Sequence, residues 1–264
     1  MPSVSNIAVG ALVAGAAATK ARHGMNESIA RLSTGMRSVY GGDAAGQSVA
    51  NTLEARSKSW AVAARNAEDG ISAAQVSESA LLEIASIAQR IRELGIQADN
   101  AALLSTTNDV AALNSEATLL FDQIDAIVEG TTFNGVALLA ASDTTHAIGV
   151  TDGGGTVTLQ TGGTITAVKA HTKADGADTT ADTTLKEVAI SLGNVAAGIA
   201  ALKARQAVAY SASANLAAAA ARIEDTDFAK ETANLTKYSV LNQSAMAMVA
   251  QANQAQSAIL AVLQ

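Results

Sequence analysis

Three histidines are the side chains in this sequence best suited to acid–base catalysis or metal binding at neutral pH. They are His23, His146 and His171, and no HExxH motif or other metal-ligand spacing joins them. Because a metal ion or a catalytic base needs partners at fixed spacings, this pattern favours solvated surface or loop histidines. The chain also contains no cysteine, which excludes a thiolate nucleophile and a thiolate metal site.

Two further patterns could bind ions but lack the required partners. Asp175, Asp178 and Asp182 do not alternate as calcium ligands do, and no terminal glutamate follows at the spacing of a calcium loop. The glycines at 153–155 precede a predicted strand and are not followed by the Lys-Ser/Thr pair of a phosphate-binding loop. We therefore predict no catalytic, metal-binding or cofactor-binding site, and an enzyme is the least favoured class.

The composition favours long helices. Hydrophobic residues make up 49% of the 264 residues but aromatic residues only 3%, and much of the apolar content is alanine. The single proline is Pro2, so no later residue forbids an unbroken helix in the way that proline does. The net charge of −7 argues against a general nucleic-acid binder, which is normally basic.

Composition divides the chain into three parts. Residues 1–142 and 184–264 are predicted to be helical, whereas residues 143–183 are rich in Thr, Gly and Asp. Within the middle part, two β-branched runs at 156–159 and 164–168 are separated by residues 160–163. This spacing predicts a small β-hairpin with 160–163 as its loop. The fold class is therefore mainly α, a bundle of long helices with a small β-hairpin region in the middle.

Apolar residues in the helical parts recur at alternating spacings of three and four. This spacing keeps them on one side of a helix that winds around a partner, as in a coiled coil. At the two ends of the chain these apolar seams are built largely of alanine, and we predict that the two seams pack together in polymerisation. The predicted seam residues are Ile7, Ala11, Ala14, Ala18, Leu241, Ala245, Met248, Ala252, Ile259 and Val262.

Both ends of the chain are uncharged. Residues 1–19 and 238–264 contain no Asp, Glu, Lys or Arg. The first stretch lacks the basic residues that precede the apolar run of a signal peptide, and Asn and Gln side chains scattered through the second argue against a membrane span. A helix with such a narrow alanine seam buries little area alone. We therefore expect both ends to be disordered in the monomer and to fold against partners.

Seven blocks near the two ends have a distinctive residue order. They are LSTGMR at 32–37, GDAAGQSVA at 42–50, RNAEDGIS at 65–72, QRIRELGIQA at 89–98, TTFNGV at 131–136, ARIEDTDFAKETANLTK at 221–237 and QSAMAMVAQANQ at 243–254. In this order and position they resemble the blocks of bacterial flagellins. The resemblance covers about 1–142 and 184–264, and it indicates a short form of that family with a small variable middle segment.

The resemblance implies a division into three domains. Residues 1–42 with 225–264 correspond to a terminal coiled coil that forms the filament core and lines its channel. Residues 43–142 with 184–224 correspond to a surrounding helical bundle. Residues 143–183 correspond to a small, variable, β-rich insert that faces outward.

The resemblance also implies the function and the partners. Such proteins are structural subunits that self-assemble into the helical flagellar filament used for swimming, and they catalyse nothing. They are exported unfolded through the flagellar secretion channel and end as an extracellular filament. The implied partners are further copies of the chain, an export chaperone that covers the C-terminal segment, and the filament cap and junction proteins. No cofactor, nucleic acid or membrane span is implied.

Two smaller sites are predicted. Gln89, Arg90, Leu94 and Glu116 are the residue types by which flagellins are recognised by a vertebrate innate immune receptor, the fifth Toll-like receptor. The same surface is expected between subunits in the filament. Gly41 and Gly42 are adjacent glycines between two predicted helices, and they suit either a helix C-cap or a hinge between terminal coil and bundle.

Two alternative functions stay open at this point. A hook–filament junction protein shares the end pattern but resembles the internal blocks less well. A secreted coiled-coil adhesin or binding protein would use the glycine-rich insert to bind a receptor. Ordered ends with charged faces would favour the adhesin, whereas the uncharged ends favour polymerisation.

Overall fold

The structure, a computed structural model, describes residues 4–39, 41–100, 103–105, 108–140, 142–162 and 173–263. Helices dominate this part of the chain, with two small antiparallel sheets between the third and fourth helices, which confirms the mainly α fold class. The helices are α1 (Val4–Thr34), α2 (Ala44–Ala98), α3 (Asp109–Gly130), α4 (Ala177–Glu224) and α5 (Phe228–Leu263). The strands are β1 (Thr132–Phe133), β2 (Val136–Ala137), β3 (Thr144–Gly149) and β4 (Thr156–Gly162).

The chain forms two compact units. The terminal unit comprises Met1–Ala55 and Leu216–Gln264, and the central unit comprises Arg56–Asn215. Both α2 and α4 run from one unit into the other. The finer three-domain division made from the sequence stays a prediction.

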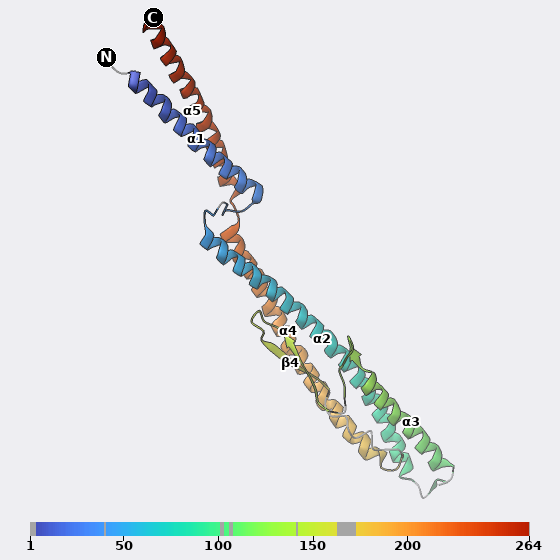
Figure 1. The fold of residues 1–264 in the computed structure, drawn as a ribbon. Coiled ribbons are helices and arrows are strands. Elements are labelled where there is room, and N and C mark those ends of the chain that lie inside the picture. The colour runs from blue at the N-terminus through green and yellow to red at the C-terminus, as the bar shows by residue number, and fades with distance from the viewer. Residues whose placement is uncertain are drawn as a thin grey trace. The chain divides into compact units, whose positions relative to one another are not determined.

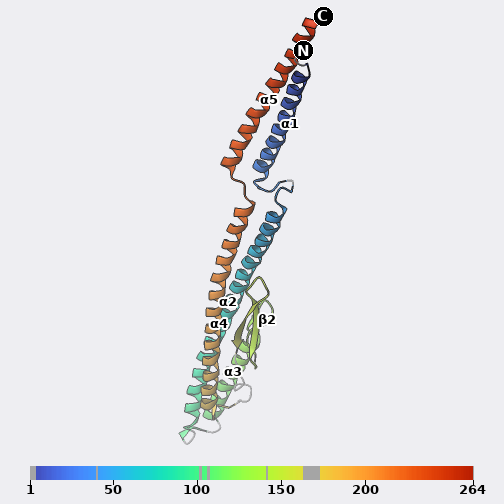
Figure 2. The same ribbon diagram turned by 90° about the vertical axis from the view of Figure 1, so that its left-hand side faces the viewer.

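In the terminal unit, α1 and α5 lie side by side and run in opposite directions (Figures 1 and 2). Ala14, Ala18 and Ala21 of α1 and Ala245 of α5 are buried between them. Small side chains let the two backbones approach closely, but each contributes little buried area. This pair is therefore closely fitted and weakly stabilised when it stands alone.

Two residues of the predicted α5 seam lie outside the contact with α1, and the role of the seam in polymerisation stays a prediction. Leu241 is 47% exposed and Met248 is 63% exposed, so neither lies in the contact with α1. Ala245 and Ala252 of the predicted seam lie on the buried and half-buried side of α5, and the other residues of that side are Tyr238, Asn242 and Val249. The apolar spacing did not predict this side of α5, because Tyr238 and Asn242 are among its residues. Ala11 is half-buried as predicted for its seam, whereas the side chains of Ile7, Ile259 and Val262 lie outside the described residues.

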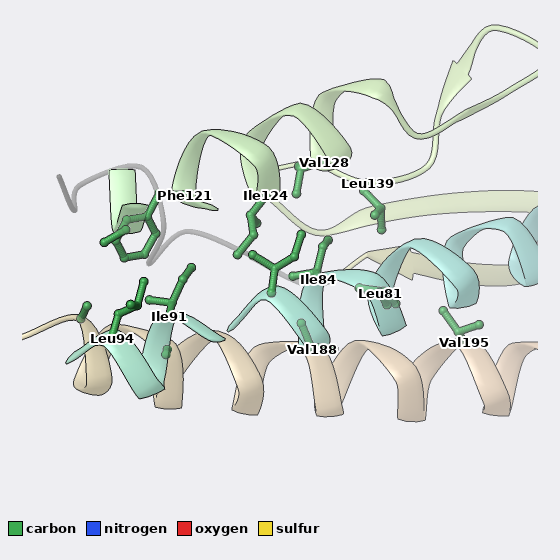
Figure 3. Packing of buried hydrophobic residues seen from close by; sticks show 14 of the residues in the cluster. Leu81, Ile84, Ile91, Leu94, Phe121, Ile124, Val128, Leu139, Val188 and Val195 are labelled. Carbon is green, nitrogen blue, oxygen red and sulfur yellow. The ribbon is translucent and has the colours of Figure 1, made fainter. Parts of the chain in front are cut away.

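The central unit has the larger hydrophobic core. Figure 3 shows α2 between α3 and α4, with Ile84, Ile91 and Leu94 of α2 meeting Phe121 and Ile124 of α3. Val188 and Val195 of α4 complete the core, and Leu139 and Leu159 close it from the strand side. Each large apolar side chain removed from water here stabilises the unit by about 1.5–3 kcal/mol.

Two glycines allow close approach within this core. A Cβ at Gly198 of α4 would lie 2.5 Å from Leu159 Cδ1, so the strand side of the core can pack directly on the helix. A Cβ at Gly95 of α2 would collide with the backbone nitrogen of Asp178. Both glycines lower helix propensity, but each is needed because a side chain would hold two elements apart.

The small sheets are formed by tight turns. β1 and β2 are joined by Asn134 and Gly135, whose φ angles of 49° and 78° are those of a two-residue hairpin turn. β4 pairs in antiparallel register with β3, with Gly149 opposite Thr156 and the glycines at 153–155 in the turn. The predicted hairpin is therefore corrected: its first strand pairs with the preceding strand β3, and residues 160–162 belong to β4 instead of a loop. The predicted strand at 164–168 lies outside the described residues.

One helix in the described residues, α4, is long and apolar enough to cross a membrane by length and composition. Only 22% of its most apolar 18-residue window is buried inside the protein. Val188, Val195 and Leu202 are its large buried apolar residues, and they pack in the core against α2. The outward face of α4 is therefore also unusually apolar.

Candidate assembly surface

The two connections between the helices of the terminal unit are joined to each other. The Arg37 N–H donates to the carbonyl of Glu224 at 2.7 Å, and the Thr226 N–H donates to the carbonyl of Gly35 at 2.9 Å. Met36 and Asp225 form an antiparallel bridge between these bonds. Gly35, with φ +71°, caps α1 by donating its N–H to Arg31. The α1–α2 and α4–α5 connections thus hold one another in place.

The Arg37 side chain strengthens this junction. Its Nε donates to the carbonyl of Ile223 at 3.0 Å, and its guanidinium forms an ion pair with Asp43. Asp43 Oδ1 also accepts a hydrogen bond from the Gly46 N–H at 2.9 Å, in the first turn of α2. That backbone hydrogen bond, followed by the one from Arg37, holds the pKa of Asp43 below its ordinary value.

The predicted hinge glycines lie beside this junction. Gly41 has φ +75°, a conformation that glycine adopts without strain, and a side chain there would meet no neighbour within 4 Å. Gly42 donates its N–H to Val39 at 3.3 Å. The geometry explains the need for glycine at 41, and the hinge role itself stays a proposal.

A charged cluster lies in the otherwise apolar contact between α1 and α5. Glu231 of α5 is 6% exposed, and Arg31 Nη1 lies 3.5 Å from its Oε1. Asn234 Nδ2 donates to Glu231 Oε2 at 3.3 Å, and the buried Ser28 hydroxyl lies beside the carboxylate. Burial raises the pKa of Glu231, but Ser28, Asn234 and Arg31 together outweigh it and bring the pKa below 4.5. A carboxylate therefore stays charged inside this contact at neutral pH.

The side of α1 that faces away from α5 is apolar and uncovered. Val9, Leu12 and Val13 are 53%, 76% and 62% exposed, and they follow one another on the face opposite Ala14 and Ala18. No charged residue lies among them, because the first is Lys20. A helix that is apolar on both faces is normally buried on both faces. The isolated chain leaves this face without a covering layer in the described residues.

The predicted receptor surface is only partly assembled. Arg90 of α2 donates from Nη2 and Nε to Glu116 Oε1 of α3, at 2.7 and 3.0 Å, and from Nη1 to Glu93 at 3.0 Å. Glu116 first, and then Glu93, raise the pKa of Arg90. Gln89 is exposed beside it. Leu94 does not belong to this surface: it is 1% exposed and packs in the core, because it lies four residues from Arg90 but on the inner side of α2.

Several residues of these sites were missed by sequence reasoning. Glu93 stands three residues after Arg90, a spacing that predicts a helical pair. Glu231 could have been singled out as the acidic residue nearest the uncharged C-terminal stretch, but its pairing with Arg31 could not. The two residues lie 200 positions apart, and only the antiparallel pairing of α1 with α5 brings them together.

Within the described residues, no group of three or more His, Asp or Glu side chains could hold a metal ion. His23 is exposed on α1, and His171 lies outside the described residues. His146 lies on β3 and lines an apolar hollow of about 480 Å³ with Asp69, Phe133 and Leu159. Its Nε2 is buried without a hydrogen-bond partner. The hollow holds no nucleophile paired with a base, so the geometry does not define a reaction centre.

Paired uncharged ends and a long helical bundle define a class of protein: a helical subunit that associates with further copies of itself. Comparison with known proteins identifies the family. Residues 6–144 match the family model described as the bacterial flagellin N-terminal helical region. Residues 176–263 match the model described as the bacterial flagellin C-terminal helical region. The chain belongs to the bacterial flagellin family.

Relatives with the name flagellin cover most of the chain. The flagellin of Halalkalibacterium halodurans is 35% identical over 88% of this chain and 89% of its own length. The flagellin of Bacillus subtilis is 33% identical over 88% of this chain and 90% of its own length. A crystal structure of Bacillus cereus flagellin aligns with a TM-score of 0.41 and 26% identity, over 58% of this chain and 88% of that chain.

The family defines the role in outline. The protein is a structural subunit that self-assembles into the flagellar filament, an extracellular structure. The prediction of a flagellin made from the sequence blocks is confirmed. The alternatives, a hook–filament junction protein and a secreted adhesin, are not favoured, because both helical family regions and the relatives are those of flagellins.

Proposed function

We propose that the terminal unit drives polymerisation and that α1 and α5 complete their folding when the filament covers them. The observation that carries this proposal is the exposed apolar face of Val9, Leu12 and Val13 on an uncharged helix. Burying this face against neighbouring copies removes it from water, and the absence of charge avoids a desolvation penalty. The α1–α5 contact is built largely of alanines and gains in the filament the stability that it lacks alone.

The remaining expectations follow from this role. The chain travels unfolded through the flagellar secretion channel, and the weakly stabilised α1–α5 pair and the absence of disulfides suit such threading. An export chaperone covers the C-terminal part of α5 before export, and cap and junction proteins contact the chain at the filament ends. The protein acts outside the cell, and its role is structural with no catalysis.

The receptor surface is proposed in a reduced form. Gln89 and Arg90 are exposed and Glu116 is half-buried beside them, and we infer that an innate immune receptor contacts this group, whereas Leu94 is buried. Because Arg90 is already engaged by Glu116 and Glu93, a receptor carboxylate would have to share it. Gly41 and Gly42 are proposed as a hinge between the terminal coil and the bundle.

Seeded polymerisation tests the role of the terminal unit. Purified chain is mixed with short filament seeds and examined by electron microscopy, and the critical concentration is measured by sedimentation. We expect long uniform filaments from the full chain and none from a chain that lacks residues 238–264. Leu12→Asp should raise the critical concentration more than about tenfold, since an uncompensated charge would be buried, while the matched control Leu12→Met should leave it within about twofold. If Leu12→Asp assembles at the critical concentration of the wild type, the proposal is contradicted.

A further inference from the structure

A hollow of about 480 Å³ lies between α2 and the small sheets of the central unit. Its inner wall is formed by four buried residues: Gly70, Ala73, Leu138 and Leu159. Because α2 contributes only a glycine and an alanine to this wall, little side-chain volume fills the space between the helix and the strands. The volume is in the range of about 300–1,000 Å³ that is typical of sites for small molecules, and such sites are also mostly apolar.

The mouth of the hollow carries negative charge. Asp69 of α2 and Asn134 of the β1–β2 turn are exposed among its lining residues, and Val136 of β2 is 50% exposed. The carboxylate of Asp69 disfavours an anionic ligand at this position, and the net charge of −7 acts in the same direction. The inner wall is apolar, so it disfavours a ligand that would bury a charge of either sign. An uncharged ligand with a largely apolar surface fits both conditions.

His146 adds an unsatisfied polar atom to this apolar lining. Its Nε2 is buried and has no hydrogen-bond partner in the part of the chain that the structure describes. A buried nitrogen without a partner costs free energy, which a ligand recovers by supplying the missing hydrogen bond. The χ2 torsion of histidine is roughly two-fold, so a half-turn of the ring exchanges Nε2 with Cε1 and lets the nitrogen meet a ligand. A hydroxyl group suits either tautomer of the imidazole, because it can both donate and accept.

We propose that this hollow binds a small uncharged molecule with one apolar ring and one hydroxyl group, the ring against Leu138 and Leu159 and the hydroxyl hydrogen-bonded to His146. The ring and the inner wall then remove apolar surface from water together. A carboxylate on the same ring would be repelled by Asp69, and a ring without the hydroxyl would leave the imidazole unsatisfied. This inference goes beyond the filament role and does not depend on it, since all the lining residues belong to the central unit.

Titration of the full-length monomer with phenol, toluene and benzoate, followed by ligand-observed NMR, tests the ligand class. We expect phenol to bind the wild type with a Kd of about 0.1–1 mM and benzoate to bind at least about tenfold more weakly. His146→Phe keeps a ring on β3 and removes the nitrogen. It should weaken phenol binding about tenfold and change toluene binding less than about twofold. Absence of saturable phenol binding to the wild type, or an equal loss for phenol and toluene in His146→Phe, overturns the proposal.

A second pair of variants tests where phenol binds. Val136→Trp places a large ring at the mouth of the hollow and should abolish detectable phenol binding. Ala137→Trp is the matched control: it is the next residue of β2, it is exposed, and its side chain points to the opposite face of the strand. It should leave the Kd for phenol unchanged. Circular dichroism of both variants should match the wild type, since both positions are exposed. Undiminished phenol binding by a folded Val136→Trp variant overturns the proposal, and so does an equal loss in Ala137→Trp.

Discussion

The aromatic ring of Tyr238 in α5 lies directly on the backbone of Gly24 in α1. A Cβ at position 24 would come within 2.6 Å of ring atoms Cε1 and Cζ, so the glycine forms a notch that the ring fills. Much of the rest of the α1–α5 contact consists of alanines, which fit together in more than one register. The ring in its notch, together with the Arg31–Glu231 pair, selects one register for the two helices.

The first prediction concerns this notch. Gly24→Ala should lower the stability of the α1–α5 pair, because displacing the ring costs about 1–3 kcal/mol and outweighs the gain of about 1 kcal/mol in helix propensity. Thermal dissociation of filaments, followed by circular dichroism, measures the change. Gly15→Ala is the matched control, since a Cβ there meets nothing within 4 Å and should stabilise α1. In a Tyr238→Ala background the same Gly24→Ala change should cause no loss of stability; a loss that persists there would show that the ring is not its cause.

The second prediction separates core from surface in α2. Leu94→Ala should destabilise the central unit by about 2–5 kcal/mol, as expected for a buried leucine that leaves a cavity. Gln89→Ala, on the exposed side of the same helix, should change the free energy of unfolding by less than about 0.5 kcal/mol. Urea denaturation of the monomer measures both. Equal effects would mean that Leu94 is exposed in solution.

The third prediction concerns pH. The pKa of Glu231 is lower in the folded protein than its ordinary value of 4.5, so its charged form stabilises the fold. This contribution is fully present above about pH 4.5 and is lost as the pH falls through the lowered pKa. Glu231→Gln should therefore be less stable than the wild type by about 1–2 kcal/mol at pH 7.

The stability difference between the wild type and Glu231→Gln should shrink toward zero as the pH falls through this lowered pKa. Filament melting temperatures between pH 3 and pH 7 test this, and Glu27→Gln serves as an exposed control near the same Arg31. A difference that is independent of pH would place the cause in packing and not in charge.

The fourth prediction concerns the junction between the two connections of the terminal unit. Arg37→Ala removes the hydrogen bond to Ile223 and the ion pair with Asp43, so both connections should open more often. Chymotrypsin, which does not depend on arginine, should then cleave faster after Phe228, a 56% exposed residue beside the junction. Arg22→Ala makes the same change of charge on the exposed surface of α1 and should leave the rate unchanged.

The sequence predicted the long helices and the family well because both depend on local patterns. Each of these patterns is contained within a few turns of helix: the alanine-rich seams, the single early proline and the blocks near the two ends. The face of a helix that meets its partner was harder to predict. Leu241 and Met248 fitted the apolar spacing of α5, yet Tyr238 and Asn242 lie on the side that is half-buried, because a glycine opposite accommodates the ring.

Pairing between distant segments could not be predicted from the sequence. β4 pairs with β3 across the glycine turn at 153–155, a partner that the spacing of the β-branched runs alone did not indicate. The Arg31–Glu231 pair depends on the antiparallel arrangement of helices at opposite ends of the chain. Leu94 was assigned to a surface by resemblance, but it lies one turn beyond Arg90 and is turned far enough round α2 to be buried in the core.

The turn between β3 and β4 is closed at its base by the Val150 N–H, which donates to Gly155 at 2.9 Å, and by Thr151 Oγ1, which accepts from the Gly155 N–H at 2.6 Å. A side chain at Gly153 or Gly154 would meet nothing within 4 Å. A foreign peptide grafted between these two glycines would therefore start and end on a backbone that is already fixed. Since the helical seams lie elsewhere, each copy in a filament would carry the graft, and the polymer would become a scaffold for dense, regular display of an antigen or an enzyme.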